Sequence, residues 1–390
     1  MTIDVSISRL HTLLNPKLLL TDPVHMKIYR GVHQLPAGGR ALTIGNFDGV
    51  HRGHQAMLAL LNNEARHRGV PSCVMTFEPH PRDYFAALHR KPELAPARIA
   101  TLRDKLLELA RCGVDECVVL PFNARLAGQP ADSFIDDTLL ADMDVRYVLV
   151  GDDFRFGKGR VGDYAMLDAA GEAQGFDVAR MQSYEVHGLR VSSSAVREAL
   201  TEGRMSSVAA LLGRPYSISG HVVHGRKLGR ELGASEPGKG DGFRTLNLRF
   251  SHWKPAASGI FAVHVHGLHP DPKAPPLIGV ANLGVRPSLD PTDVNGGRVL
   301  LETHCLDWPA DMAAQWPLVN GHREAYGKII RVDLLHKLHD ERKYDSLDAL
   351  TSGIAKDCAD ARAWFASSAF AATQTHTQTR RQTTRDRIQS

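Results

Sequence analysis

The chain has 390 residues, of which 43% are hydrophobic and 23% are charged, and its formal net charge is +4. This length leaves room for two or three domains, and the composition is ordinary for a soluble globular protein. No apolar run approaches the ~20 residues that span a bilayer, and most of the net charge comes from four arginines after Phe365. Composition therefore supports neither membrane insertion nor nucleic-acid binding.

The first residues lack the basic, apolar and small-residue order of a signal peptide. The five cysteines show no C-x-x-C pair or metal-binding spacing, and most of them lie in apolar runs. The sequence therefore predicts a cytoplasmic protein with reduced core thiols. These thiols belong to Cys73, Cys112, Cys117, Cys305 and Cys358.

From residue 40 to about residue 180, short β-rich runs alternate with helical patterns. This alternation predicts an α/β fold with a parallel sheet covered by helices on both faces. Ligands bind such sheets at the carboxyl ends of the strands. Strands are predicted at 41–46, 72–77, 116–121, 146–151 and 177–181, and helices at 51–68, 98–111, 131–141 and 163–174.

The segment after the first predicted strand reads GNFDGVHRGH over residues 45–54. A Gly-rich turn at a helix N-terminus offers free backbone N–H groups and the positive end of the helix dipole to an anion. His51 and His54 are spaced i, i+3, so both can reach the same phosphate. The turn has neither the Walker pattern nor the G-x-G-x-x-G spacing of dinucleotide sites. The plain alternative is a tight turn with two surface histidines.

The second half of the chain has a different sequence pattern. Short helices are predicted at 194–202 and 205–212, and Gly213-Arg214-Pro215 then interrupts the pattern. From Tyr216 to about Leu335, short β-branched runs separated by Gly and Pro predict a small closed β-barrel. These runs are 217–225, 245–250, 259–267, 278–284, 299–306 and 328–336.

A last helix is predicted to start near Ser346, a good N-cap residue. Its apolar stripe is expected to dock on the barrel and consists of Leu347, Leu350, Ile354, Cys358 and Ala361. Residues 366–390 have almost nothing to bury and are predicted to be disordered. The first ~25 residues give no assignable pattern.

At residues 45–54 the chain resembles the HxGH nucleotidyltransferases and, more narrowly, the bacterial bifunctional riboflavin kinase/FAD synthetase family. Three further segments resemble that family's motifs in the same order: Phe77–Pro81 its F-x-P-H-P loop, Gly151–Gly157 its G-x-D-F-R-F-G segment, and Val191–Arg197 its I-S-S-T-x-I-R segment. The resemblance implies that residues 30–212 form a Rossmann-like FMN adenylyltransferase (FAD synthetase) domain behind an N-terminal extension, residues 1–29.

The resemblance also implies roles for single residues. His51 and His54 would stabilise charge on the transferring phosphate, and Arg197 would bind the leaving pyrophosphate. A serine cluster before a helix, taken alone, is more often only a cap. The residues that the resemblance assigns to ATP or flavin are Gly45, Asn46, Phe47, Asp48, Gly49, Gly53, Pro79, His80, Pro81, Asp153, Phe154, Arg155, Ser192, Ser193 and Ser194.

Residues 213–365 resemble the riboflavin kinase domain, whose fold in that family is a small Greek-key-type barrel. Gly225 and Gly229 would let backbone N–H groups approach ATP, and Thr245 and Asn247 would serve Mg²⁺ and nucleotide from one face of a strand. Glu302 matches the base that takes the proton of the ribityl 5′-hydroxyl; a surface strand carboxylate is the alternative. Relative to the family pattern, Ala234–Gly242 is an insertion.

The leading prediction is a cytoplasmic bifunctional enzyme that phosphorylates riboflavin to FMN and adenylylates FMN to FAD. ATP is the co-substrate and Mg²⁺ the cofactor of both steps. One alternative keeps the adenylyltransferase and makes the barrel a non-catalytic flavin-binding or regulatory module. Another is a different HxGH enzyme, such as a cytidylyl or pantetheine adenylyl transferase. The sequence leaves the oligomeric state open.

Overall fold

The computed structural model of the chain forms two compact units, Met1–Ala195 and Val196–Ser390. Helix α8 (Ser193–Thr201) crosses the border between them. The predicted domain limits at 29/30, 212/213 and 365/366 stay predictions. The structure describes residues 26–33, 35–182, 184–186, 189–223, 245–249, 254–269, 271, 273–286, 298–307, 318–319, 322–323, 325–367 and 370. The predicted sites at Gly225 and Gly229, the insertion at 234–242, most of the N-terminal extension and nearly all of the predicted tail lie outside these residues.

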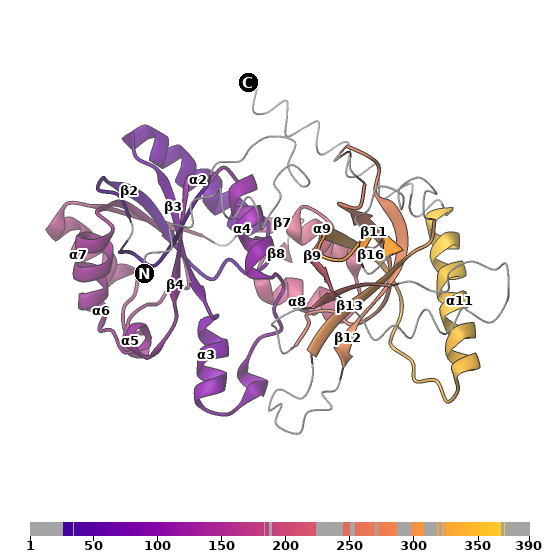
Figure 1. The fold of residues 1–390 in the computed structure, drawn as a ribbon. Helices are drawn as coiled ribbons and strands as arrows, with labels where there is room; N and C mark the ends of the chain where they lie inside the picture. Colours follow the sequence, from indigo (N-terminus) through magenta and orange to yellow (C-terminus); the bar gives the residue numbers. More distant parts are fainter. Residues whose placement is uncertain are drawn as a thin grey trace. The chain divides into compact units, whose positions relative to one another are not determined.

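The first unit is built on a six-stranded sheet in the order β1-β4-β3-β2-β5-β6, in which every neighbouring pair is parallel (Figure 1). The prediction of a parallel sheet is therefore confirmed. The edge strand β1 was not predicted, because it has four residues and two of them are exposed. The strands are β1 (Lys27–Arg30), β2 (Arg40–Ile44), β3 (Ser72–Glu78), β4 (Glu116–Pro121), β5 (Val145–Gly151) and β6 (Asp177–Met181).

Helices cover both faces of this sheet (Figure 1). Helices α2 (Arg52–Arg68) and α4 (Leu102–Arg111) pack on one face. The other face is covered by α6 (Ala131–Ser133), the π-helix η3 (Phe134–Asp142) and α7 (Tyr164–Gln174). The helix predicted at 131–141 thus exists but is mostly π-wound, a difference that an apolar pattern this short does not encode. The short helices α3 (Pro81–Leu88), η2 (Pro92–Leu94), α5 (Ala124–Ala127) and η4 (Lys158–Arg160) were not predicted.

The second unit holds a closed antiparallel barrel in the order β10-β13-β12-β11-β16-β9. Strands β11, β12 and β13 follow one another, and β16 returns to lie beside β11, which is the Greek-key order. The predicted barrel is therefore confirmed. Its strands are β9 (Tyr216–Val223), β10 (Leu246–Arg249), β11 (Gly259–His266), β12 (Leu277–Arg286), β13 (Arg298–Cys305) and β16 (Ile329–His339). Two small ladders also occur, β7 (Glu185–Val186) with β8 (Leu189–Arg190) and β14 (Leu318–Val319) with β15 (His322–Arg323).

Helix α9 (Met205–Leu212) and the C-terminal helix α11 (Leu347–Phe365) pack on the barrel (Figure 1). The Ser346 hydroxyl caps α11 by accepting a hydrogen bond from the Ala349 N–H at 3.1 Å. Ala361 is fully buried and Cys358 packs beside it, but Leu347 is 64% exposed. The docking stripe therefore begins later in the helix than the sequence pattern predicts.

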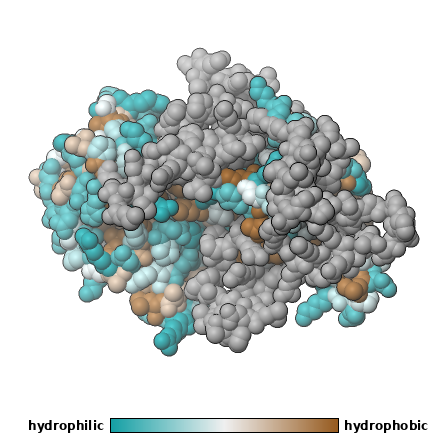
Figure 2. Space-filling model, viewed as in Figure 1, coloured by the Kyte–Doolittle hydropathy of each residue, from teal (hydrophilic) through white to brown (hydrophobic). Residues whose placement is uncertain are grey.

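All five cysteines are free thiols, and those on β3, β4 and β13 are buried: Cys73, Cys117 and Cys305. Burial raises the pKa of Cys117 to about 12. Among the described residues, no helix is long and apolar enough to cross a membrane. On the face in Figure 2, the described surface is largely hydrophilic, with hydrophobic residues in separate patches.

Candidate active sites

The turn between β2 and α2, residues 45–54, is tightly wound; we call it the histidine turn. Phe47 and Val50 have positive φ angles of 48° and 40°, although both side chains are buried. Such conformations are costly for these residue types and mark functional sites. Gly49 has a φ of +82°, and a Cβ there would meet Ile99 at 2.7 Å. The predicted binding residues of this turn are Gly45, Asn46, Phe47, Asp48, Gly49 and Gly53.

The two histidines stack on each other, with ring centroids 3.6 Å apart. His51 is the N-cap of α2, and its Nδ1 accepts a hydrogen bond from the His54 N–H at 3.3 Å. Burial, and then the neighbouring His51 and Lys105, hold the pKa of His54 well below its usual range, so this imidazole is neutral at pH 7. The buried Nδ1 of His54 has no hydrogen-bond partner within the described part of the chain. A buried nitrogen without a hydrogen-bond partner indicates that a ligand binds there or that the side chain acts in catalysis.

Asp48 is buried and holds the turn against the segment before α4. Its carboxylate accepts hydrogen bonds from the N–H groups of Ile99 and Ala100, at 3.2 and 3.1 Å. Its carbonyl oxygen accepts one from the Ser193 hydroxyl at 3.1 Å. The structure thus brings the serine segment to the histidine turn, about 145 residues away in sequence.

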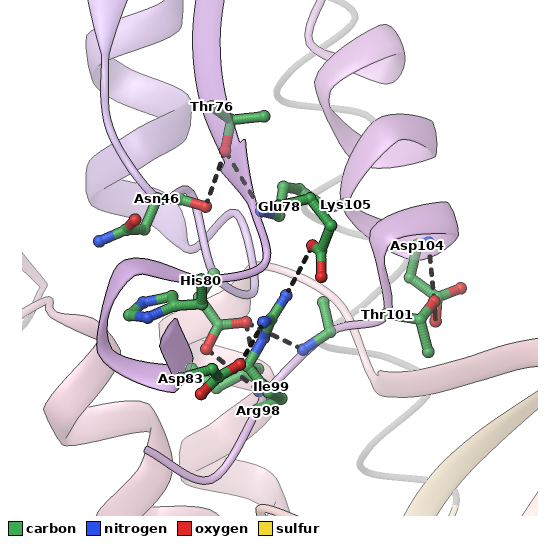
Figure 3. Close-up of polar contacts among 12 residues, drawn as sticks. Asn46, Thr76, Glu78, His80, Asp83, Arg98, Ile99, Thr101, Asp104 and Lys105 are labelled. Atoms are coloured by element: carbon green, nitrogen blue, oxygen red, sulfur yellow. Dashed lines mark hydrogen bonds and ion pairs between the residues drawn. The ribbon is translucent and has the colours of Figure 1, made fainter. Parts of the chain in front are cut away.

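Behind the turn lies a buried chain of hydrogen bonds, which we call the Lys105 relay (Figure 3). The Lys105 ammonium donates to the Thr76 hydroxyl at 3.2 Å, and that hydroxyl donates to the Asn46 carbonyl at 3.2 Å. Lys105 is 1% exposed and Thr76 is fully buried. The relay therefore connects helix α4 and strand β3 to the backbone of the histidine turn.

A buried arginine fixes the adjoining loop (Figure 3). The guanidinium of Arg98 contacts Glu78 at 3.2 Å and Asp83 at 2.8 Å. His80 caps α3, because its Nδ1 accepts a hydrogen bond from the Arg82 N–H at 3.1 Å. These contacts hold the end of β3 beside the start of α3.

The predicted prolines and the loop after β5 are more exposed to solvent than the histidine turn. Pro79 is exposed and Pro81 is the first residue of α3. After β5, Asp153 and Arg155 are exposed, and Arg155 forms an ion pair with Asp163 at 3.1 Å. The Phe154 ring stacks on the Phe156 ring, with centroids 5.5 Å apart. The loop lies at the carboxyl edge of the sheet, as the histidine turn does.

The serine segment supplies the start of α8. The Ser192 hydroxyl accepts a hydrogen bond from the Ala195 N–H at 3.2 Å, while Ser194 is exposed. Arg197 lies further along α8, in the second compact unit.

In the barrel, three polar residues face one another across three strands; we call them the barrel row. Glu302 on β13 stands opposite Asn247 on β10 and opposite Asn282 on β12. Directly opposed residues of antiparallel strands share one face, so both amides flank the carboxylate. The Oδ1 atoms of Asn247 and Asn282 are buried without a hydrogen-bond partner in the part of the chain that the structure describes. Thr245 precedes β10, and its carbonyl accepts from the Asn247 amide at 3.2 Å.

Three residues of these sites escape the sequence analysis: Thr76, Lys105 and Asn282. Lys105 sits on the apolar stripe of α4 with Leu106 and Leu109, so a charged residue on a buried face was the available signal. Asn282 likewise interrupts the apolar run at residues 277–285 of β12. Thr76 gives no signal of its own, because threonine is common in strands.

Comparisons with known proteins match both units. A family model described as FAD synthetase matches residues 34–195, and one described as riboflavin kinase matches residues 212–365. A protein of Escherichia coli (strain K12) named bifunctional riboflavin kinase/FMN adenylyltransferase is 43% identical over 87% of this chain and 98% of its own length. Proteins of the same name from Pseudomonas fluorescens and Haemophilus influenzae are 41% and 38% identical, and each aligns over 99% of its own length.

The fold also resembles those of solved structures. A crystal structure described as a macrolide-efflux protein from Streptococcus pneumoniae has a TM-score of 0.63 and 24% identity, over 86% of this chain and 98% of its own. At that identity, the likeness concerns the fold alone.

Proposed function

Because this chain belongs to the family of bifunctional riboflavin kinases/FMN adenylyltransferases, we propose that its two reactions are divided between the sheet and the barrel. The chain is an enzyme with riboflavin kinase and FAD synthetase activities. It converts riboflavin to FMN with ATP, and FMN to FAD with a second ATP and release of pyrophosphate. The alternatives without a kinase, or with another nucleotidyl transfer, are set aside by the same matches.

For the adenylyl transfer, the histidine turn is the proposed centre. An FMN phosphate oxygen attacks the α-phosphorus of ATP, and the bond to the leaving pyrophosphate oxygen breaks. Negative charge that develops on the phosphate oxygens is stabilised by the α2 N-terminus, His51 and His54. The single observation that carries this proposal is the buried, unpartnered Nδ1 of the neutral His54 at a helix N-terminus.

For the remaining residues of the adenylyl site, we propose ATP and flavin contacts. The exposed Asp153, Arg155 and Pro79 stand on loops at or near the carboxyl edge of the sheet, and the exposed Ser194 lies in the first turn of α8. Arg197 is the proposed partner of the pyrophosphate, because its guanidinium can bind two oxygens at once. His80 and Asp48 already have backbone partners, so their proposed part is to shape the loops.

For the phosphoryl transfer, the barrel row is the proposed centre. Glu302 takes the proton of the ribityl 5′-hydroxyl, whose oxygen attacks the γ-phosphorus of ATP while ADP leaves. Thr245 and Asn247 would hold Mg²⁺, and the unpartnered carboxamide oxygen of Asn247 has the hard-oxygen chemistry that this ion prefers. The ion, when bound, neutralises charge on the phosphates.

Mg²⁺ usually keeps several waters and takes few protein ligands beside substrate phosphates. In the described residues there is no group of three or more His, Cys, Asp or Glu side chains that could hold a metal ion. We also propose a cytoplasmic location, which the free thiols and the use of ATP support.

The proposal is tested with the purified chain and separate tubes of riboflavin or FMN, each with Mg-ATP, analysed by chromatography. FAD is expected from both tubes, with FMN as an intermediate in the first. FAD from the FMN tube alone would contradict the barrel assignment. FMN without FAD from the riboflavin tube would contradict the assignment of the sheet.

A further inference from the structure

Lys105 is a fully buried lysine that neither proposed reaction explains. Its side chain is 1% exposed, and it forms no ion pair among the residues that the structure describes. Its ammonium donates one hydrogen bond, to the Thr76 hydroxyl. Lysine is rarely buried without a paired charge, because desolvation of the ammonium is expensive. A buried, unpaired ammonium at this place therefore calls for a function.

The nearby carboxylates are engaged elsewhere. Asp48 accepts from the backbone N–H groups of Ile99 and Ala100, and Glu78 pairs with Arg98. Burial, and then the positive charge of Arg98, lower the pKa of Lys105, while Asp48, Glu78 and Cys117 oppose the shift. An anion bound in front of the histidine turn would favour the charged ammonium.

The relay leads to one peptide group of the histidine turn (Figure 3). Thr76 can accept from Lys105 and donate to the Asn46 carbonyl at the same time, because a hydroxyl is both donor and acceptor. The Asn46–Phe47 peptide is trans, so the Phe47 N–H points away from Thr76. In the described part of the chain this N–H has no hydrogen-bond partner.

A chain of hydrogen bonds polarises each of its members. The Lys105 charge draws electrons along Thr76 and the Asn46 carbonyl, and the N–H of the same peptide becomes a stronger donor. The positive φ of Phe47 requires this peptide to be held firmly, because the conformation is unfavourable without support. The Lys105 relay therefore both fixes the Asn46–Phe47 peptide in this conformation and polarises it.

We propose that Lys105 is a positioning residue for adenylyl transfer, which acts through Thr76 to fix and polarise the Asn46–Phe47 peptide so that the Phe47 N–H binds a phosphate oxygen of ATP. The proposal rests on the function proposed for the histidine turn. It adds a buried cation on α4 and a hydroxyl on β3 to the electrostatics of that site.

The test compares Lys105→Met, Thr76→Val, the double variant and Thr76→Ser in FAD formation from FMN and Mg-ATP. Thr76→Val removes the hydroxyl with little change in shape and is expected to lower kcat roughly 10-fold. Lys105→Met is expected to lower it roughly 10- to 100-fold. Because both act on one path, the double variant is expected to be no slower than Lys105→Met alone. Thr76→Ser is expected to recover most of the rate that Thr76→Val loses.

A pH profile separates this role from a structural one. His51, from the turn, and Lys105, from α4, are the titratable groups that face His54. Removal of the Lys105 charge raises the pKa of His54, so the acid limb of kcat in Lys105→Met is expected to move to higher pH. Thr76→Val keeps the Lys105 charge and is expected to lose rate with this limb unmoved. A loosened fold would hydrate His54 and move the limb in Thr76→Val as well, because burial is the first cause of its low pKa.

Two controls keep the outcome decisive. Riboflavin phosphorylation by each variant reports that the barrel unit of the same chain is intact and is expected to stay at the parent rate. Lys27→Met, at an exposed position of β1, is the matched loss of a lysine charge and is expected to be silent. Should Lys105→Met fail to fold, the contrast of Thr76→Val with Thr76→Ser carries the test.

The relay is wrong if Thr76→Val forms FAD at the parent rate, or if the two single effects add in the double variant. A parent chain that forms no FAD from FMN would instead refute the function proposed for the turn. The two failures are therefore distinguishable in one set of assays.

Discussion

The histidine turn draws its groups from one continuous segment, residues 45–54, whereas the barrel row joins Asn247, Asn282 and Glu302 from three strands. The turn presents donors: a helix N-terminus, a neutral imidazole and, behind them, a buried ammonium. The row presents acceptors: a carboxylate whose two neighbouring asparagines each have a buried carboxamide oxygen without a partner among the described residues. A donor site suits the charge that develops on phosphate oxygens, and an acceptor site suits proton removal and a hard cation.

The comparison is tested most severely by Glu302→Gln, which keeps the shape of the side chain and removes the base. FMN formation from riboflavin is expected to fall about 10²- to 10⁴-fold. FAD formation from supplied FMN is expected to stay at the parent rate, because the histidine turn is untouched. The initial rates of FMN and FAD formation are measured separately. If Glu302→Gln phosphorylates riboflavin at the parent rate, Glu302 is not the base.

The reverse experiment is His54→Ala. FAD formation from FMN is expected to fall about 10²- to 10³-fold, because a donor to the developing charge is lost, while FMN formation continues. His67→Ala is the matched control, since His67 is an exposed residue of the same helix. Equal FAD rates in His54→Ala and His67→Ala would contradict the assignment, and His51→Ala is expected to behave like His54→Ala.

Two glycine variants test how much the close packing of the histidine turn against Ile99 adds to the cost of a side chain at a positive φ. Gly49→Ala faces both a positive φ and contact with Ile99, whereas Gly69→Ala, at the end of α2, faces a φ of +66° in open space. Gly69→Ala is expected to lower the free energy of unfolding by about 1 kcal/mol, and Gly49→Ala by about 2–4 kcal/mol. Urea unfolding of both variants gives the difference, and equal losses would mean that the Ile99 contact relaxes freely.

The barrel has a carboxylate whose pairing makes it sensitive to acid. Burial alone would raise the pKa of Asp333, but the hydrogen bond from His266 at 3.0 Å and the charge of Arg331 outweigh it and hold this pKa below its usual range. The stability that this group contributes is therefore complete above about pH 4, the unfolded value, and is lost as pH falls below it.

The Asp333→Asn variant is accordingly expected to show a smaller drop in urea midpoint between pH 7 and pH 3 than the parent. Asp307→Asn, which alters an exposed pair with Arg362, is the control and is expected to follow the parent. Identical pH dependence of Asp333→Asn and the parent would show that Asp333 titrates normally. This is the smallest of the expected effects.

Much of this architecture is predictable from local patterns. The strand predicted at 41–46 is observed at Arg40–Ile44, and the helix predicted at 51–68 at Arg52–Arg68, because continuous apolar runs and a capped, amphipathic segment are local signals. The histidine turn is predictable for the same reason, since its groups are consecutive in the sequence. Strand β1 is too short to carry a period, and helix α3 buries only Ala86, so it has little apolar pattern to recognise.

The groups that the sequence analysis missed depend on contacts between distant segments. Lys105 meets Thr76 only because α4 packs over β3, and a helical pattern does not say which strand it will cover. Asn282 flanks Glu302 because of the register between β12 and β13, and a slip of one residue would turn it to the other face. Register and helix packing are properties of the assembled fold, so no local pattern encodes them.

The buried thiols make each half of the chain a reporter of its own opening. Cys73 and Cys117 lie in the sheet, and Cys305 lies in the barrel. Burial raises the pKa of all three thiols, so the reactive thiolate is suppressed while the strands stay closed. With enough thiol reagent for labelling to outpace reclosing, each thiol is modified at the rate at which its half transiently opens. The order in which they are labelled gives, from the native sequence without any added probe, the relative lifetimes of the two closed states.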